Sequence, residues 1–305
     1  MRSRGIYYCE PVFRPPSEAG SLLVHATVGC KYRCAFCVPY LHKKFRVRPV
    51  GEVVADLEEA RRLYGAGVRR VFLLDGNAMA APTDHLLEVT RATKRLFPKL
   101  ERVSVYAHAR DVLDKDGDEL SALAREGLTL AYVGIETGDP EWLRRVGKAT
   151  TPDEIVEAGH ELHRAGITFS GTIILGITGW DAGLESSKRH AAATAEVVNR
   201  LNPAPPRKWY VAALSLMIPP GTRVARWVEA GKFRPLNATQ VLLELLALLE
   251  GLDPSLKMCV FRANHASNYL PLKGTLARDL EALKERVRHA IAHPEVLKPE
   301  YFRGL

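Results

Sequence analysis

The stretch RVFLLDGNAMAAPTDHLLEVTRATKRL, residues 70–96, contains one complete unit of the fold. Residues 70–74 are apolar and partly β-branched, which predicts a strand, and the Asp-Gly-Asn sequence at 75–77 predicts a turn. A capping pair, Thr83 and Asp84, comes next, and positions at helical spacing follow it: Leu86, Val89, Thr93 and Leu96. The stretch therefore predicts a strand, a turn and a helix in succession.

The same unit recurs on both sides of this stretch. Strand character is found at residues 21–28, 70–74, 102–107, 128–135, 168–175 and 208–217. Helical spacing lies between these segments, and glycine or proline stands where the helices should end, at positions 65, 98, 127 and 166. Such alternation predicts parallel strands with right-handed crossovers. We therefore predict an α/β fold, a partial (βα)6 TIM-like barrel.

The pattern changes after Gly221. Residues 223–230, 238–249 and 276–291 favour helices, and residues 257–262 favour an extended piece. We therefore divide the chain into an irregular N-terminal segment (1–20), the partial barrel (21–222) and a helical C-terminal cap (223–305).

The composition is that of an ordinary folded chain, with 305 residues, 47% hydrophobic and 26% charged. The most apolar stretch, 241–249, contains Glu244 and is shorter than the ~20 residues of a spanning helix, so no membrane association is expected. The first ten residues lack the apolar core of a signal peptide, and five cysteines, three of them crowded together, favour a reducing compartment. We expect a cytoplasmic protein, whose net charge of +8 favours an anionic substrate or partner.

Three cysteines form the pattern C-x3-C-x2-C just after the first predicted strand: Cys30, Cys34 and Cys37. Thiolates this close together can bind one metal centre. A structural zinc ion normally takes four ligands, for which His42 is available at an unusual spacing. An iron–sulfur cube held by three thiolates would keep one iron open. Three unrelated thiols near a turn are the remaining interpretation.

With Phe36 directly before the last cysteine, this motif resembles the signature of the radical S-adenosylmethionine (radical SAM) enzymes. The resemblance extends over residues 21–222. It implies that Cys30, Cys34 and Cys37 hold a catalytic 4Fe–4S cluster, with S-adenosyl-L-methionine (SAM) on the fourth iron and Phe36 beside the cofactor. It further implies a reductant of the ferredoxin or flavodoxin kind, reductive cleavage of SAM, and a 5′-deoxyadenosyl radical that takes hydrogen from a substrate.

The resemblance also implies cofactor contacts at the strand ends, where β/α barrels collect their chemistry. Asp75, Gly76 and Asn77 follow the second predicted strand and stand where the family holds the methionine amino group of SAM. A plain strand-to-helix turn is the alternative. Tyr106 ends the third strand, where it can face the cofactor or lie at the surface.

The later strand ends carry the remaining cofactor candidates. Glu136 lies in the sequence Gly-Ile-Glu-Thr-Gly-Asp-Pro, which is most similar to the elongator catalytic subunit, the tRNA methylthiotransferases and the nitrogenase-cofactor assembly protein. The resemblance suggests that Glu136 contacts the ribose hydroxyls or the methionine amine; an ion pair at the rim is the alternative. It also implies that Ile174 packs on adenine, that Gly176 allows close approach, and that Met217 and Ile218 line the adenine. A buried strand and a simple Pro-Gly turn are the alternatives for these last residues.

Substrate candidates lie in two polar segments and at one strand end. The basic loop after the cysteines can contact RNA phosphates, hold an anionic small molecule or form a solvated surface: Lys43, Lys44, Arg46 and Arg48. No RNA-binding module accompanies it, so RNA stays a possible partner without dedicated support. His108 ends the third strand. In the cap, a polar segment contacts substrate or forms a capped helix start: Asn264, His265, Asn268 and Tyr269.

We therefore predict a radical SAM enzyme, a transferase or an oxidoreductase, with an unidentified substrate. Sulfur insertion into an acyl chain, as in lipoyl and biotin synthases, and tRNA base modification are the alternatives within this class. Outside it stand an iron–sulfur electron-transfer or scaffold protein and a zinc-stabilised binding module. Cys9 and Cys259 are interpreted as buried inert thiols, or else as ligands of a second cluster or carriers of sulfur.

Overall fold

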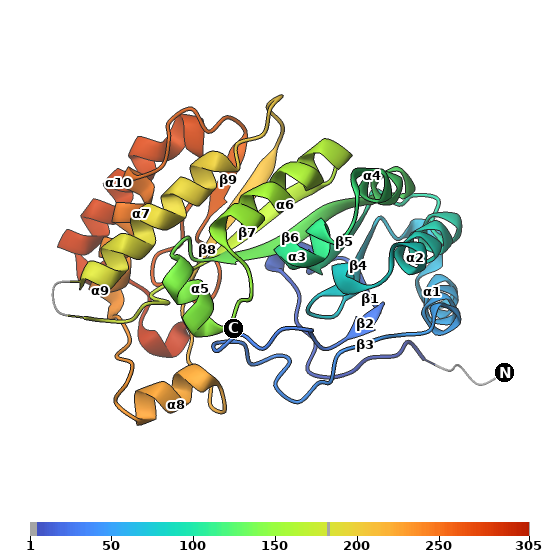
Figure 1. Cartoon of the computed structure of the whole chain (residues 1–305), viewed down its shortest axis with the longest axis horizontal. Coiled ribbons are helices and arrows are strands. Elements are labelled where there is room, and N and C mark those ends of the chain that lie inside the picture. The colour runs from blue at the N-terminus through green and yellow to red at the C-terminus, as the bar shows by residue number, and fades with distance from the viewer. Residues whose placement is uncertain (1–4, 182–183, 305) are drawn as a thin grey trace. The chain divides into compact units, whose positions relative to one another are not determined.

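The computed structural model describes residues 5–181 and 184–304 (Figure 1). The chain forms two compact units. Unit 1 consists of Met1–Arg33, Pro39–Val133 and Glu157–Phe169, and unit 2 of Cys34–Val38, Gly134–Val156 and Ser170–Leu305. The predicted division into residues 1–20, 21–222 and 223–305 follows the course of the chain rather than its contacts, and it stays a prediction.

Unit 1 contains parallel strands in the order β1-β4-β5-β6. Their bounds are Leu22–His25, Arg70–Leu74, Arg102–Ala107 and Leu128–Glu136, with the last three residues of β6 counted in unit 2. The helices that follow the strands are α1 (Val50–Tyr64), α2 (Thr83–Leu96), α3 (Ala109–Leu113) and α4 (Gly117–Glu126), and Figure 1 shows α1, α2 and α4 side by side. The predicted bounds of the strands at 70–74 and 102–107 are confirmed.

The predicted strand at 21–28 is divided in two. β1 ends at His25, and Ala26 instead donates its N–H to the carbonyl of Leu74 at 2.9 Å. β2 (Thr27–Val28) then pairs antiparallel with β3 (Arg46–Val47). Because β2 and β3 pair, the ends of the segment 29–45 are brought together, and this segment carries the three motif cysteines.

Unit 2 contains parallel strands in the order β7-β8-β9, followed by β10 antiparallel to β9. Their bounds are Thr168–Leu175, Trp209–Ser215, Cys259–Arg262 and Lys273–Thr275, and the first two residues of β7 count in unit 1. The C-terminal cap therefore contains two strands besides its helices. β9 agrees with the extended piece expected at 257–262 and lies between β8 and β10, whereas β10 was not expected.

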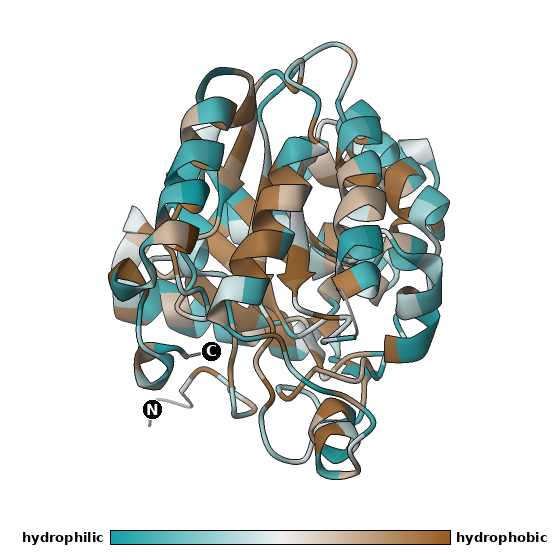
Figure 2. Cartoon of the chain, turned by 90° about the vertical axis from the view of Figure 1, so that its left-hand side faces the viewer, coloured by the Kyte–Doolittle hydropathy of each residue, from teal (hydrophilic) through white to brown (hydrophobic). Residues whose placement is uncertain are grey.

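The helices of unit 2 are α5 (Pro140–Val146), α7 (Glu185–Arg200), α8 (Arg223–Glu229), α9 (Ala238–Glu250) and α10 (Leu276–Ala292), while α6 (Pro152–Ala165) is shared between the units. α7, α9 and α10 lie side by side (Figure 1). Figure 2 shows hydrophobic residues concentrated on the strands and hydrophilic ones on the exposed faces of helices. Within the described ranges, each helix is too short or too polar to cross a bilayer.

Candidate cofactor site

The motif cysteines lie on the irregular segment between β2 and β3, and each is partly exposed. Three cysteine sulfurs within residues 30–37 are the donor chemistry of an iron–sulfur cluster. Among the residues that the structure describes, no group of three or more His, Cys, Asp or Glu side chains is arranged to hold a metal ion. Ligation by Cys30, Cys34 and Cys37 therefore stays a prediction, supported by the donor set and its spacing.

Asp111, in the first turn of α3, anchors the residue after Cys30. Its Oδ1 lies 2.5 Å from Lys31 Nζ, and its Oδ2 accepts a hydrogen bond from Asn77 Nδ2 at 2.7 Å. Burial acts to raise the pKa of Asp111, but the hydrogen bonds from Lys31, Asn77 and Tyr32 outweigh it and lower the pKa. An ionised Asp111 thus joins the start of the cysteine loop to the turn after β4.

The turn after β4 carries two buried oxygen atoms that lack a donor. Asp75 Oδ2 accepts hydrogen bonds from the Gly29 N–H and from Lys43 Nζ, both at 3.0 Å. Asp75 Oδ1 and Asn77 Oδ1 are buried without a hydrogen-bond partner in the described part of the chain. Such acceptors are costly to bury, and they suit an ammonium group like the methionine amine of SAM.

Gly76 and Tyr106 are packed within unit 1. A Cβ on Gly76 would collide with the ring of Tyr40, so the glycine allows this aromatic side chain to lie on the turn. Tyr106 lies edge-on to Phe72 and Tyr132, with ring centroids 5.0 and 6.1 Å apart. These contacts are structural, and cofactor binding by Gly76 and Tyr106 stays a prediction.

Glu136, at the end of β6, forms a buried ion pair with Lys148. Lys148 Nζ lies 2.8 Å from Glu136 Oε1, and both side chains are less than a tenth exposed. Lys148 directly follows Gly147, the left-handed C-cap of α5, whose carbonyl lies 4.0 Å from Cys34 Sγ. The ion pair that was the alternative interpretation of Glu136 is therefore present. Its lysine directly follows Gly147, which contacts Cys34.

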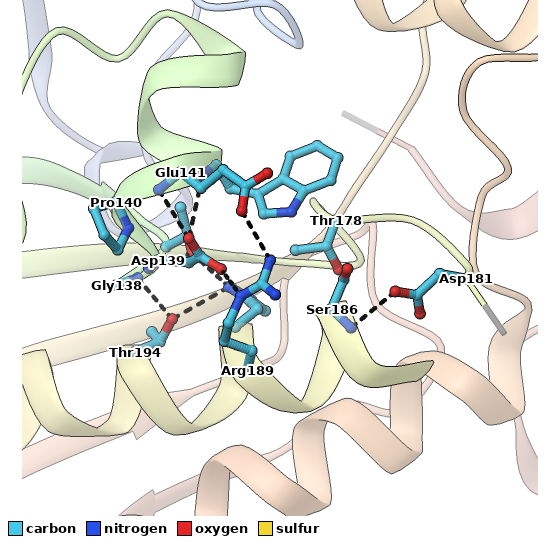
Figure 3. Close-up of polar contacts among 12 residues, drawn as sticks. Gly138, Asp139, Pro140, Glu141, Thr178, Asp181, Ser186, Arg189 and Thr194 are labelled. Atoms are coloured by element: carbon cyan, nitrogen blue, oxygen red, sulfur yellow. Dashed lines mark hydrogen bonds and ion pairs between the residues drawn. The ribbon is translucent and has the colours of Figure 1, made fainter. Parts of the chain in front are cut away.

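The loop after Glu136 is held by α5 and α7 (Figure 3). The Gly138 N–H donates to Thr194 Oγ1 at 2.8 Å. Asp139 accepts from the N–H groups of Glu141 and Trp142 and so caps α5, and Arg189 Nε lies 2.6 Å from its Oδ2. These contacts orient the backbone that carries Glu136.

Three predicted cofactor residues meet in an apolar cluster of unit 2. Ile174 from β7 packs with Ala35 of the cysteine segment, and Phe36 and Ile218 lie against the same cluster. The Ala35 backbone pairs with Val146 on one side (N···O 2.7 Å) and Val224 on the other (O···N 3.1 Å). The chain segment of the last two motif cysteines is therefore packed on the residues predicted to contact adenine.

Gly176, Met217 and Ile218 also line a cavity of about 830 Å³ in unit 2. Gly176 has φ +78°, a conformation that favours glycine, and its N–H donates to Glu244 Oε1 at 2.6 Å. The Met217 sulfur lies 3.1 Å from a guanidinium nitrogen of Arg303, which also donates to the Leu216 carbonyl at 3.0 Å. The cavity has the size of a small-molecule site.

The basic loop does not present four cations to solvent. Lys43 is buried and donates to the carbonyls of Cys9 and Pro11, both at 2.7 Å, besides pairing with Asp75. Arg48 is 1% exposed and lies 2.7 Å from Asp56 Oδ2. Lys44 and Arg46 are exposed. Of the four basic residues, Lys44 and Arg46 therefore remain candidates for contacting a phosphate group.

The other substrate candidates have local partners. His108 is buried, caps α3 by accepting from the Arg110 N–H, and stacks on Tyr32 at 3.6 Å. Asn268 bridges Ser215 and the Ala213 carbonyl, both at 2.9 Å. The hydroxyl of Tyr269, in the wall of the cavity, donates to Glu300 at 2.6 Å; His265 contacts Ser267; and Asn264 is exposed.

The two cysteines outside the motif differ in environment. Cys259 is fully buried in β9, and burial raises the pKa of its thiol, as expected for an inert core cysteine. Cys9 is half-buried, and its N–H donates to His25 Nε2 at 3.3 Å. A second cluster at these residues stays a prediction without a structural observation to support it.

Four residues with a part in the site were not singled out for it from the sequence: Asp111, Lys148, Glu244 and Arg303. Asp111, Glu244 and Arg303 act through partners 80, 68 and 87 residues away in the chain, and Lys148 through Glu136, 12 residues before it; no sequence pattern reveals these pairings. Glu244 alone gave a signal, as a carboxylate inside a leucine-rich helical stretch, where an unpaired charge would be costly.

Comparison with known proteins identifies the family. A model of the radical SAM superfamily matches residues 24–184. The chain is 32% identical over 167 residues to the ribosomal protein uS12 methylthiotransferase RimO of Cereibacter sphaeroides (50% of this chain, 34% of that protein). It is 29% identical over 198 residues to biotin synthase of Prochlorococcus marinus (62% and 51%).

A solved structure confirms the fold. Coproporphyrinogen III oxidase (HemN) of Escherichia coli, a radical SAM enzyme, matches with a TM-score of 0.53 at 17% identity, covering 75% of this chain and 52% of that chain. The predicted α/β class with a partial TIM-like barrel is thereby confirmed, as are the 4Fe–4S cluster and SAM as the cofactors of the family. The chain spans about a third of the length of the first curated relatives. The protein belongs to the radical SAM superfamily.

Proposed function

We propose that the protein is a radical SAM enzyme that cleaves SAM reductively at a 4Fe–4S cluster held by Cys30, Cys34 and Cys37. The observation that carries the proposal is the superfamily match over residues 24–184, which contains the C-x3-C-x2-C motif. When bound and reduced, a cluster held by these cysteines would supply the electron for reductive cleavage of SAM to a 5′-deoxyadenosyl radical that abstracts hydrogen from a substrate.

The side chains of this protein would bind and orient SAM. In unit 1, the donorless oxygens of Asp75 and Asn77 suit the methionine amine. In unit 2, the Glu136–Lys148 pair provides a carboxylate and an ammonium group, and Phe36 and Ile174 provide apolar surface for the nucleoside.

Sulfur insertion is the second candidate within this class, because the matched relatives include a methylthiotransferase and biotin synthase. The burial of Cys259 does not favour this thiol as a sulfur carrier. We further propose a ferredoxin- or flavodoxin-like reductant, an anionic substrate in keeping with the net charge of +8, and a cytoplasmic location.

The test is anaerobic cluster reconstitution, reduction, and incubation with SAM. We expect a 4Fe–4S absorption and paramagnetic resonance signal and release of 5′-deoxyadenosine, both lost in Cys34→Ala. Cys9→Ala is the matched control, since Cys9 is a half-buried cysteine outside the motif, and it should keep both.

Two results would contradict the proposal. A protein that binds iron and sulfide but releases no 5′-deoxyadenosine would be an electron-transfer or scaffold protein. One zinc ion in place of iron, with a fold that is lost on chelation, would be the zinc-stabilised module.

A further inference from the structure

Glu244 is a carboxylate in the most apolar helix of unit 2. It lies on α9 among Leu242, Leu245 and Leu248, and its side chain is fully buried. Burying an ionisable group in such surroundings is costly unless hydrogen bonds compensate for the lost water. The residue therefore needs partners.

Those partners come from the end of β7 and from α7. The Gly176 N–H donates to Glu244 Oε1 at 2.6 Å, and the Ser187 hydroxyl donates to Oε2 at 2.5 Å. His190 Nε2 lies 3.4 Å from Oε1. The carboxylate thus holds a backbone amide at the place where the family resemblance expects the adenine of SAM.

The contacts continue to the end of β6. His190 Nδ1 lies 2.7 Å from Thr137 Oγ1 and 3.3 Å from Thr194 Oγ1, and Thr137 directly follows Glu136. The Asp139 N–H donates to Thr137 Oγ1 at 3.0 Å. One buried chain of polar groups therefore joins two strand ends that carry predicted cofactor residues.

The hydrogen bonds from Thr137 to His190 and from His190 to Glu244 can all be donated towards Glu244. Burial lowers the pKa of His190 to about 4, against the opposing influence of Asp139, so its ring is neutral at neutral pH. We assign the proton to Nε2, which faces Glu244, because Nδ1 then accepts from the Thr137 hydroxyl at 2.7 Å. Glu244 accepts from these donors in its ionised form above its pKa of about 7.

We propose that Glu244 is a positioning residue for SAM: its ionised carboxylate holds the Gly176 amide and, through His190 and Thr137, the backbone that carries Glu136. This inference rests on the proposed function. It assigns to α9 of the C-terminal cap a part in cofactor binding without contact with the cofactor.

The inference predicts a characteristic pH dependence of SAM binding. Burial raises the pKa of Glu244 to about 7, although the bonds from Ser187 and Gly176 act to lower it. The titratable group facing it from α7 is His190, and no charged group of the other described elements adds to this shift. SAM binding should therefore weaken as the pH falls from 8 to 6, since Glu244 becomes protonated.

The experiment measures the Kd of SAM for the reconstituted, unreduced holoprotein at pH 6 to 8 by anaerobic calorimetry. We expect Glu244→Gln to bind roughly threefold to tenfold more weakly at pH 8 and to lose the pH dependence. Glu250→Gln is the matched control, because Glu250 is an exposed residue of the same helix, paired with Arg288; it should match the wild type.

Ser187→Ala guards against a variant that fails to fold. It keeps the carboxylate but removes one donor, so the pH midpoint of SAM binding should rise. An unchanged Kd and pH profile in Glu244→Gln, or an unchanged midpoint in Ser187→Ala, would overturn the inference. Absence of SAM binding in the wild-type holoprotein would instead overturn the proposed function.

Discussion

Glu136 has a backbone conformation that glutamate rarely adopts. Its φ is 60°, in the left-handed region, which is unfavourable for a side chain with a Cβ. The 2.8 Å bond to Lys148 and the burial of both side chains hold it there. Gly134 makes this possible, since a Cβ at that position would overlap both charged groups.

We expect Gly134→Ala to destabilise the fold by about 1–3 kcal/mol, because the ion pair must move to admit a methyl group. Gly51→Ala is the control: Gly51 lies in α1 with nothing within 4 Å of an added Cβ, and alanine favours a helix by about 0.5–1 kcal/mol. Urea unfolding measures both variants. Equal stabilities would show that the Glu136–Lys148 pair does not occupy this space.

At the scale of elements, α7 and α9 pack through a polar contact inside an apolar interface. His190 from α7 and Glu244 from α9 are both fully buried, and burial shifts their pKa values in opposite directions. Each shift opposes the charged form. The pairing of these helices therefore depends on pH.

For His190 the sign follows from its pKa, about 4 in the folded state against an ordinary value of 6.5. Between these values the unfolded chain binds more protons, so the contribution of His190 is complete above pH 6.5 and is lost as the pH falls towards 4. Urea midpoints of the wild type and His190→Gln, compared from pH 4 to 7, should diverge as the pH rises. A difference that does not vary with pH would contradict the assignment of a neutral histidine.

At the scale of the whole molecule, cofactor binding and folding are linked. A group that binds only the folded chain stabilises it, and the more tightly it binds the larger the effect; thiolate ligands are brought together only by folding. The cysteine segment, closed by β2 and β3, is thus expected to gain stability when loaded.

We expect the reconstituted protein to unfold roughly 5–10 °C above the protein stripped by a chelator, corresponding to about 2–3 kcal/mol. In Cys34→Ala the two preparations should unfold together. Differential scanning calorimetry under anaerobic conditions measures the midpoints. A wild-type protein with the same midpoint in both preparations would show that the cluster is not linked to the fold.

The sequence by itself determined the periodic and contiguous features of this protein. The strands at 70–74, 102–107 and 168–175 were predicted with the observed bounds, because each is a short run rich in apolar and β-branched residues. The cysteine motif was equally visible, since its donors lie within residues 30–37. Both the family and the barrel fold follow from such local patterns.

Only the tertiary structure decided which side chains pair. Lys43 and Arg48 read as members of one basic loop, yet they are neutralised internally by Asp75 and Asp56. Glu244 lies 68 residues from the amide that it binds. Side-chain pairing depends on distances between chain segments that periodicity does not encode, so these buried partners became known when the strands and helices were assembled.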